Sequence, residues 1–179
     1  MRLFLAAELP AGVRDGLVDW ARAALGRGEQ PRRLAGDALH LTLCFLGEQP
    51  ASAVPAIAGA LGECAELLAA VEDLYVGAPA WLPPRHPRVL AVEIGDPAGA
   101  LRALREALAG ALEHVIGWEA GRERFRPHVT VARMRPGRQR ARALAPTPAL
   151  RFAPDAATLF RSTLDPGGAR YEPLASLAR

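Results

Sequence analysis

Two short segments of the chain share a His-x-Thr pattern that could carry out proton transfer. They are His40-Leu41-Thr42 and His128-Val129-Thr130, at about one-quarter and three-quarters of the 179 residues. Side chains alternate along a strand, so each His and the Thr two residues later would point to one face. An imidazole exchanges a proton near neutral pH, and a hydroxyl can donate a hydrogen bond. The pattern indicates two related halves that face a shared site.

A pair of imidazoles and a pair of hydroxyls suits in-line displacement at phosphorus. One imidazole activates the attacking oxygen, the other protonates the leaving oxygen, and Thr42 and Thr130 hold the non-bridging oxygens. The two motifs alone do not say whether His40 or His128 is the acid. The scheme uses no metal and no nucleotide cofactor, and the sequence has no GxxxxGK[ST], GxGxxG or HExxH motif.

Two other interpretations of the histidines remain open. Each could be a structural residue whose hydrogen bonds are satisfied locally, although two matching motifs argue against this. A zinc site is disfavoured because no cluster of Cys, Asp or Glu supplies the remaining ligands. Strict alternation also places Cys44 on the face of His40 and turns Phe45 away from it, so we interpret Phe45 as a core residue.

The densest positive charge of the chain surrounds His128. Between positions 122 and 142, Glu123 is the only acid among the arginines Arg122, Arg124, Arg126, Arg133, Arg135, Arg138, Arg140 and Arg142. The segment is either a solvated basic face or a surface that follows a nucleic-acid backbone. Arg133 follows the second motif directly. Strict alternation points it away from His128, so a bulge or twist must bring it to the site.

Length and hydrophobic periodicity predict one α+β domain over residues 1–179, with two lobes. We expect mostly antiparallel sheets with helices on their outer faces. The expected strands cover 2–9, 39–46, 72–80, 88–94, 128–133, 149–153, 157–164 and 170–175. The expected helices begin at Pro10, at Ser52-Ala53-Val54-Pro55 and at Asp96-Pro97, and residues 27–38 are expected to form a loop.

The composition predicts a soluble protein of the cytoplasm. The chain has no apolar run of 18 residues and no signal peptide at its N-terminus. Cys44 and Cys64 have no metal spacing and are expected to be reduced thiols. The net charge of +3 permits an anionic partner without requiring one. Nothing in the sequence requires more than a monomer.

The two motifs in their wider context resemble those of a known family. His40-Leu41-Thr42-Leu43-Cys44-Phe45-Leu46-Gly47-Glu48 and Phe125-Arg126-Pro127-His128-Val129-Thr130-Val131-Ala132-Arg133 are similar to the paired signatures of the 2H phosphoesterases. Within that superfamily they most resemble the bacterial and archaeal RNA 2′,3′-cyclic phosphodiesterases, also called 2′–5′ RNA ligases. The resemblance covers essentially the whole chain.

This resemblance implies a bilobal fold with two sheets and a central cleft. It also implies a catalytic function. The implied reaction opens a 2′,3′-cyclic phosphate at an RNA 3′ end to a 2′-phosphomonoester without metal or cofactor, with 2′–5′ ligation in some members. By resemblance, His40 is the general acid and His128 the general base, Thr42 and Thr130 hold the phosphate, and Arg133 assists binding. The motif position of Phe45 implies a role in seating the base, although alternation ranks it as a core residue first. The substrates would be RNA ends, such as tRNA fragments, or small cyclic nucleotides. A binding module with vestigial catalytic residues is the third alternative.

Overall fold

The computed structural model describes residues 1–26, 31–121, 124–134, 144–165 and 168–179. Its strands are β1 (Arg2–Glu8), β2 (Arg32–Arg33), β3 (His40–Glu48), β4 (Leu74–Leu82), β5 (Val89–Gly95), β6 (His128–Arg133), β7 (Arg151–Phe152), β8 (Ala156–Asp165) and β9 (Gly168–Ala178). Its α-helices are α1 (Ala11–Leu25), α2 (Val54–Gly62), α3 (Ala65–Ala69) and α4 (Ala100–Ile116). The expected α+β fold is confirmed.

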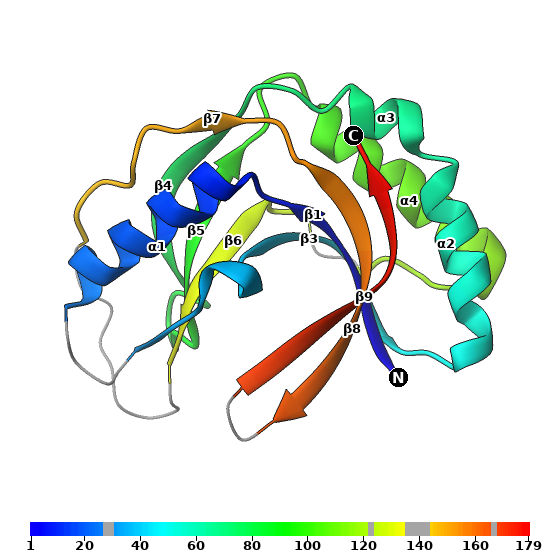
Figure 1. The fold of residues 1–179 in the computed structure, drawn as a ribbon, viewed down its shortest axis with the longest axis horizontal. Coiled ribbons are helices and arrows are strands. Elements are labelled where there is room, and N and C mark those ends of the chain that lie inside the picture. Colours follow the sequence, from blue (N-terminus) through cyan, green and yellow to red (C-terminus); the bar gives the residue numbers. More distant parts are fainter. Residues whose placement is uncertain (27–30, 122–123, 135–143, 166–167) are drawn as a thin grey trace.

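All these strands belong to one antiparallel sheet that bends into an arch (Figure 1). Their order is β7-β4-β5-β6-β3-β1-β8-β9, and β2 pairs with β6. The two expected sheets are therefore joined into one. The junction is the pair β3–β6, whose paired residues are Leu41 and Val129. This junction places the two His-x-Thr strands side by side at the centre of the sheet.

The two halves of the chain repeat one arrangement of strand, long helix and His-x-Thr strand. In the first half β1, α1 and β3 come in this order, with β2 between α1 and β3, and β1 pairs with β3. In the second half β5, α4 and β6 follow one another, with β5 paired to β6. Glu8 lies opposite His40, and Glu93 lies opposite His128, at equivalent positions of the two halves. The structure therefore contains the two related halves that the motifs predict.

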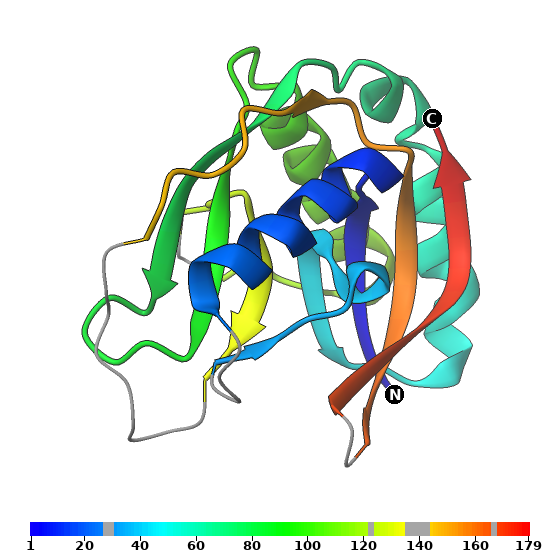
Figure 2. The same cartoon turned by 60° about the vertical axis from the view of Figure 1, so that its left-hand side comes forward.

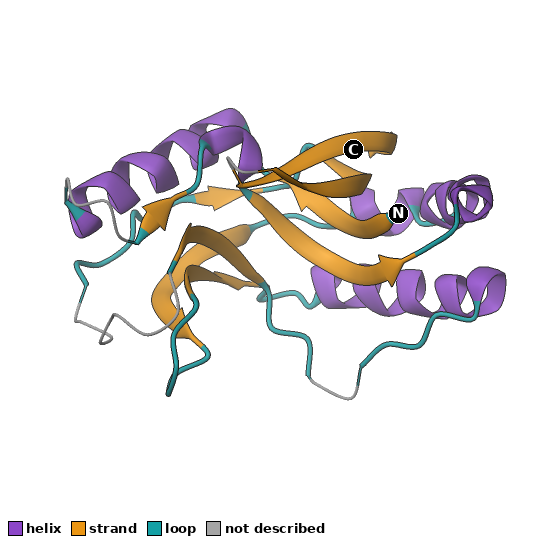
Figure 3. Ribbon diagram, turned by 90° about the horizontal axis from the view of Figure 1, so that it is seen from below, coloured by secondary structure: helices purple, strands orange, loops and turns teal. Residues whose placement is uncertain are grey.

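The helices cover the sheet in two groups, one for each lobe. Helix α1 lies against β6 through a buried stripe that includes Val13, Leu17 and Trp20 (Figure 2). Helices α2 and α4 contact β3, β8 and β9, and the two groups lie apart in the view from below (Figure 3). Burial of such apolar stripes against a sheet is the main stabilising contribution to a fold of this kind. The helices thus hold the central strands from the face that carries Leu41 and Val129.

Three local predictions were inaccurate. The expected loop at 27–38 contains strand β2 and a short 3-10 helix at Gly36–Ala38. The helix expected after Pro55 is broken into α2 and α3 around Glu63. Helix α4 begins after Gly99, three residues later than Asp96 predicts. The Asp96 carboxylate nevertheless accepts hydrogen bonds from the backbone N–H groups of Leu101 and Arg102, at 3.3 and 3.0 Å. Asp96 thus caps the helix from a distance.

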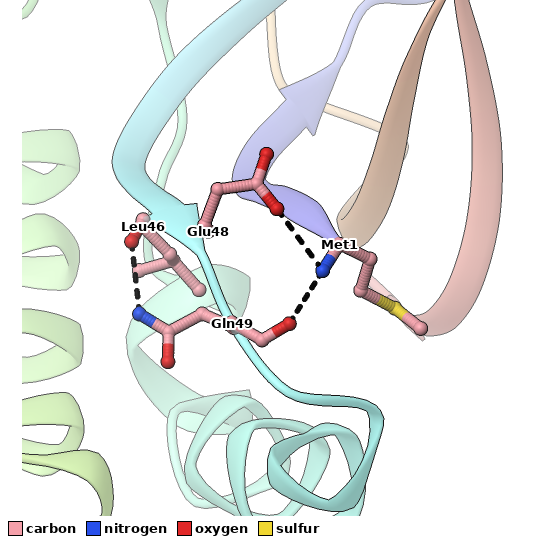
Figure 4. A network of polar contacts seen from close by, with 4 residues as sticks. All are labelled: Met1, Leu46, Glu48 and Gln49. Atoms are coloured by element: carbon pink, nitrogen blue, oxygen red, sulfur yellow. Dashed lines mark hydrogen bonds and ion pairs between the residues drawn. The ribbon is translucent and has the colours of Figure 1, made fainter.

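The end of β3 is fastened to the start of β1 by polar contacts (Figure 4). The amino group of Met1 donates to the backbone oxygen of Gln49 at 2.6 Å and forms an ion pair with Glu48 at 3.2 Å. The side-chain amide of Gln49 donates to the backbone oxygen of Leu46 at 2.9 Å. These contacts fix the far end of the strand that carries His40.

No helix in the described part of the chain is long and apolar enough to cross a membrane.

Candidate active site

The four predicted His and Thr side chains lie together on the central strand pair. Leu41 and Val129 are paired and fully buried. One residue to either side, the antiparallel register sets His40 opposite Thr130 and Thr42 opposite His128. Residues opposed in this way have Cα atoms about 4.5–5.5 Å apart. Because Leu41 and Val129 face the core, these four side chains share the opposite face of the sheet.

Both imidazoles are oriented by the same local hydrogen bond. Nδ1 of His40 lies 3.0 Å from the backbone oxygen of Ala38, and Nδ1 of His128 lies 2.8 Å from that of Arg126. A backbone oxygen can only accept, so Nδ1 carries the hydrogen in both rings. Nε2 therefore stays available for proton exchange in each ring. The carbonyl two residues upstream thus sets the same tautomer in both histidines.

His40 lies among aromatic rings that restrict its contact with water. Its ring centre is 4.9 Å from that of Phe4, 5.0 Å from Tyr171 and 6.4 Å from Phe160. The pKa of His40 is lowered to about 4, against 6.5 for an exposed histidine. Desolvation by burial is the largest cause, and the nearby charges of Arg133 and His128 act in the same direction. The hydrogen bond to the Ala38 oxygen opposes this shift. His40 is therefore neutral at pH 7 in the unliganded protein.

A β-bulge in β3 corrects the predicted placement of Phe45 and Cys44. Strand β1 pairs Ala6 with Thr42 and Leu5 with Cys44, so Leu43 is an extra residue. The bulge reverses the alternation, as bulges do when they redirect a side chain. Cys44 turns into the core, and Phe45, 50% exposed, lines a pocket together with His40 and Thr42. The interpretation of Phe45 as a core residue was therefore wrong.

Strand β6 contains a bulge at the equivalent place, and it brings Arg133 to the site. Strand β5 pairs Ala91 with Thr130 and Leu90 with Ala132, which leaves Val131 as the extra residue. The side chain of Arg133 then lies on the same face as Thr130 and lines the pocket of His40. The irregularity that the sequence required for Arg133 is present in the structure. Each motif thus presents three side chains to this face. In both motifs the second lies two positions after the histidine and the third lies three positions after the threonine.

The pocket of His40 has a volume of about 350 Å³. Its walls come from both halves of the chain, because Arg133 belongs to β6 and the other residues to β1, β3, β8 and β9. The guanidinium of Arg2 lies 4.8 Å from the ring centre of Phe45. The remaining wall residues are Phe4, His40, Thr42, Ser162, Leu164, Gly168, Ala169 and Tyr171. The pocket combines positive charge with aromatic surface, as expected for a nucleotide phosphate.

His128 borders a separate hollow of about 240 Å³ on the other side of the central pair. Glu93, Arg102 and Arg124 line this hollow, and Arg126 forms an ion pair with Glu93 at 3.0 Å. His128 at the start of β6 lines this hollow, and Arg133 at the end of β6 lines the pocket of His40. The charge of His128 contributes to the lowered pKa of His40. A group that contacts both imidazoles must therefore lie across the β3–β6 pair.

Several wall residues of the site are missed by reasoning from the sequence. Arg2 and Phe4 alternate on one face of β1, which is a usable signal, but the apolar run around them predicts only a buried strand. Tyr171 and Phe160 approach His40 because β8 and β9 form a hairpin beside β1. Of the arginines between 122 and 142, Arg124, Arg126 and Arg133 border the two hollows. Arg122, Arg135, Arg138, Arg140 and Arg142 lie outside the described residues.

The two cysteines are buried, free thiols. Desolvation raises the pKa of Cys44 to about 12 and also raises the pKa of Cys64. A thiol with a raised pKa is a poor nucleophile and a poor metal ligand at neutral pH. Within the described residues, no three His, Cys, Asp or Glu side chains are grouped so that they could hold a metal ion. The polar side chains that line the pocket of His40 carry imidazole, hydroxyl and guanidinium groups.

Comparison with known proteins places this chain in a family. The model of the 2′-5′ RNA ligase superfamily matches residues 13–166. The chain is 32% identical to an RNA 2′,3′-cyclic phosphodiesterase of Escherichia coli, covering 97% of this chain and 93% of that protein. It is 33% identical to the protein of the same name from Thermus thermophilus, covering 96% and 86% of the two chains.

Solved structures agree with these sequence matches. The crystal structure of E. coli LigT complexed with NADP⁺ superposes with a TM-score of 0.78 at 28% identity, over 99% of this chain and 96% of that one. A crystal structure from Thermus thermophilus also gives 0.78 at 29% identity, over 99% and 97% of the two chains. From the matched residues and the shared architecture, we conclude that this chain belongs to the 2′-5′ RNA ligase superfamily.

Proposed function

We propose that this protein hydrolyses 2′,3′-cyclic phosphates at RNA 3′ ends, with His40 and His128 as its acid/base pair. One observation carries the proposal. Two imidazoles, each with its hydrogen on Nδ1, and two threonines share one face of the strand pair β3–β6. The names of the two curated relatives support the substrate class, and E. coli LigT has been crystallised with 3′-AMP and with phosphate. Reversible 2′–5′ ligation is a further activity of the same proposal.

In the proposed step, Nε2 of His128 accepts a proton from water while the water oxygen attacks phosphorus. The bond between phosphorus and O3′ breaks, and His40 donates a proton to O3′, which leaves a 2′-phosphomonoester. Thr42, Thr130 and Arg133 hold the non-bridging oxygens, where negative charge increases in the transition state. Solvent then returns both histidines to their starting protonation states. No metal ion takes part in this step.

The lowered pKa of His40 bears on which histidine is the acid. A pKa of about 4 keeps His40 neutral in the unliganded protein, whereas an acid must carry a proton. A bound phosphate anion would offset the positive charge of Arg133 and favour the protonated ring, so substrate binding would raise the pKa of His40. The reversed assignment, with neutral His40 as base and His128 as acid, is the second candidate, and the same lowered pKa favours it.

A substrate whose leaving group needs no acid separates these two assignments. The comparison uses an RNA-terminal 2′,3′-cyclic phosphate and its analogue with sulfur in place of the bridging O3′, because a thiolate leaves without a proton. His40→Ala and His128→Ala should each slow the oxygen substrate by roughly 10²–10⁴-fold. The variant that lacks the acid should recover on the sulfur substrate, and the variant that lacks the base should remain slow.

The same assay in excess EDTA tests whether the reaction needs a metal. Unchanged wild-type activity is expected, and loss of activity on chelation would contradict the mechanism. Full activity of both alanine variants would contradict the two-histidine proposal, whereas a wild type that binds the RNA end without hydrolysing it would favour a binding module. Mononucleotide 2′,3′-cyclic phosphates in parallel test small nucleotides as substrates.

We also propose that the protein acts as a monomer in the cytoplasm. The two halves of one chain together supply the imidazoles, hydroxyls and guanidinium groups of the proposed site. Light scattering of the eluting protein during gel filtration tests the monomer. A mass that doubles in the active fraction would contradict it.

A further inference from the structure

Two arginines lie directly opposite each other at the edge of the site. Arg32 of β2 pairs with Arg133 of β6, so their side chains project from the same face of the sheet. Opposed residues have Cβ atoms about 4.5–5.5 Å apart, and like charges at this spacing destabilise the strand pair. In the described part of the chain, neither guanidinium forms an ion pair with a carboxylate. The uncompensated pair is therefore suited to an anion.

A hollow larger than the pocket of His40 lies beside this pair. It has a volume of about 570 Å³. It shares Arg133, Gly168, Ala169 and Tyr171 with the pocket of His40, so the two hollows are continuous. The hollow of His128, in contrast, shares no lining residue with the pocket of His40. An RNA strand that leaves the pocket of His40 in this direction enters a hollow that Arg32 lines.

Arg32 spans the hollow and reaches the β8–β9 hairpin. Its guanidinium nitrogens lie 2.8 and 2.9 Å from the place that a Cβ on Gly168 would occupy. The glycine has a φ of +119°, a conformation that side chains rarely adopt, and it lets the guanidinium lie against the backbone. This contact holds the planar donor group at the boundary between the two hollows. Arg32 is thus positioned by its neighbours without being neutralised by them.

The other charges of the hollow leave an excess of positive charge. Arg33 and Arg170 also line it, and its two carboxylates belong to Asp37 and Glu172. Glu172 lies 3.6 Å from Arg161, which offsets part of its charge. The hollow is therefore a positively charged extension of the pocket of His40.

We infer that Arg32 binds the phosphodiester that joins the terminal cyclic nucleotide to the preceding nucleotide of the RNA. This inference rests on the proposed function, because it takes the cyclic phosphate to lie at His40. An RNA continues from that nucleotide only through its 5′ oxygen, and the next group is an anionic phosphodiester. The continuous, positively charged hollow accepts this group. The protein should then prefer oligonucleotide ends to mononucleotides.

Three substrates isolate the charge of this one phosphate. They are a mononucleotide 2′,3′-cyclic phosphate, a dinucleotide with the same cyclic end, and that dinucleotide with an uncharged methylphosphonate linkage. In the wild type, kcat/KM should be roughly tenfold higher for the charged than for the uncharged dinucleotide, as for loss of one charge-assisted hydrogen bond. Arg32→Gln should abolish this difference and leave the mononucleotide rate unchanged. Arg32→Lys should retain part of the difference, because it keeps the charge without the guanidinium fork.

Arg102→Gln is the matched control, because Arg102 lines the hollow of His128. It should retain the full difference between the two dinucleotides. The inference would be overturned if Arg32→Gln kept the difference, if it slowed the mononucleotide equally, or if Arg102→Gln abolished the difference instead. Failure of the wild type on all three substrates would refute the proposed function itself, and the inference with it.

Discussion

Because His40 is buried in its neutral form, we expect the free energy of unfolding to decrease in acid. The unfolded chain binds a proton at this histidine near pH 6.5, whereas the folded protein binds it only near the lowered pKa of about 4. As the pH falls below 6.5, the unfolded state gains protons that the native state does not, and the free energy of unfolding decreases. The decrease is complete once the pH reaches about 4. Above pH 6.5 this contribution to stability is fully present.

The difference between these two pKa values corresponds to at most about 3 kcal/mol. Solvent reaches part of the ring, so this figure is an upper limit. The substitution His40→Asn isolates the contribution of His40 to this pH dependence, because the asparagine amide can still donate to the Ala38 oxygen but does not titrate. Between pH 7 and pH 4, the wild type should therefore lose up to about 3 kcal/mol more stability than His40→Asn.

Urea unfolding followed by circular dichroism at pH 7, 5.5 and 4.5 measures this difference. His86→Asn is the control, since His86 is an exposed residue of the connector between β4 and β5. It should lose stability with pH in parallel with the wild type. If His40→Asn also runs parallel to the wild type over this range, His40 is not held neutral by the fold and the reasoning fails.

Three further predictions concern the same strands. Thr42→Val and Thr130→Val should each lower kcat about 10²-fold or more, as for loss of one oxyanion donor, with unchanged urea midpoints; unchanged kcat would contradict their role. Phe45→Ala should raise KM roughly tenfold by loss of base stacking and leave stability nearly unchanged, because the ring is half exposed; steady-state kinetics and urea unfolding test both parts. Cys44 should resist thiol reagents at pH 8 in the native protein and react in urea, because burial raises its pKa to about 12. Peptide mass mapping locates the labelled cysteine, and rapid labelling of Cys44 in the native protein would contradict this expectation.

The strands of the site could be predicted from the sequence, and their pairing could not. Alternation of His40, Leu41 and Thr42 predicts a strand with one polar face, and the structure has β3 there. Register is a non-local property that depends on turns and on burial elsewhere in the sheet. The sequence therefore contains no local sign that Leu41 would pair with Val129 and join two lobes into one sheet.

The bulges mark the limit of period-two reasoning at this site. A bulge adds one residue to a strand, and every side chain beyond it changes face. For Arg133 the resemblance to a family required an irregularity, so the bulge at Val131 could be anticipated. For Phe45, strict alternation without such an irregularity predicts the wrong face. Because both halves repeat the motif, the irregularity needed in one half was a usable signal for the other.

The two halves hold their imidazoles in the same geometry, so different roles for the two histidines must come from their surroundings. Both rings have the same tautomer and face the same side of the central strands. His40 lies among Phe4, Phe160 and Tyr171, whereas His128 lies next to the ion pair of Arg126 and Glu93. Unequal environments of this kind separate the pKa values of paired acid/base groups.

This asymmetry can be tested by admitting water to His40. Tyr171→Ser removes a ring whose centre lies 5.0 Å from the imidazole, and desolvation is the largest cause of the lowered pKa. The pKa of His40 should therefore rise from about 4 toward 6.5, as measured by NMR titration of its ring protons. Tyr75→Ser is the control, because Tyr75 is an exposed ring on β4 that does not contact His40. An unchanged pKa of His40 in Tyr171→Ser would show that the aromatic neighbours do not keep this histidine neutral.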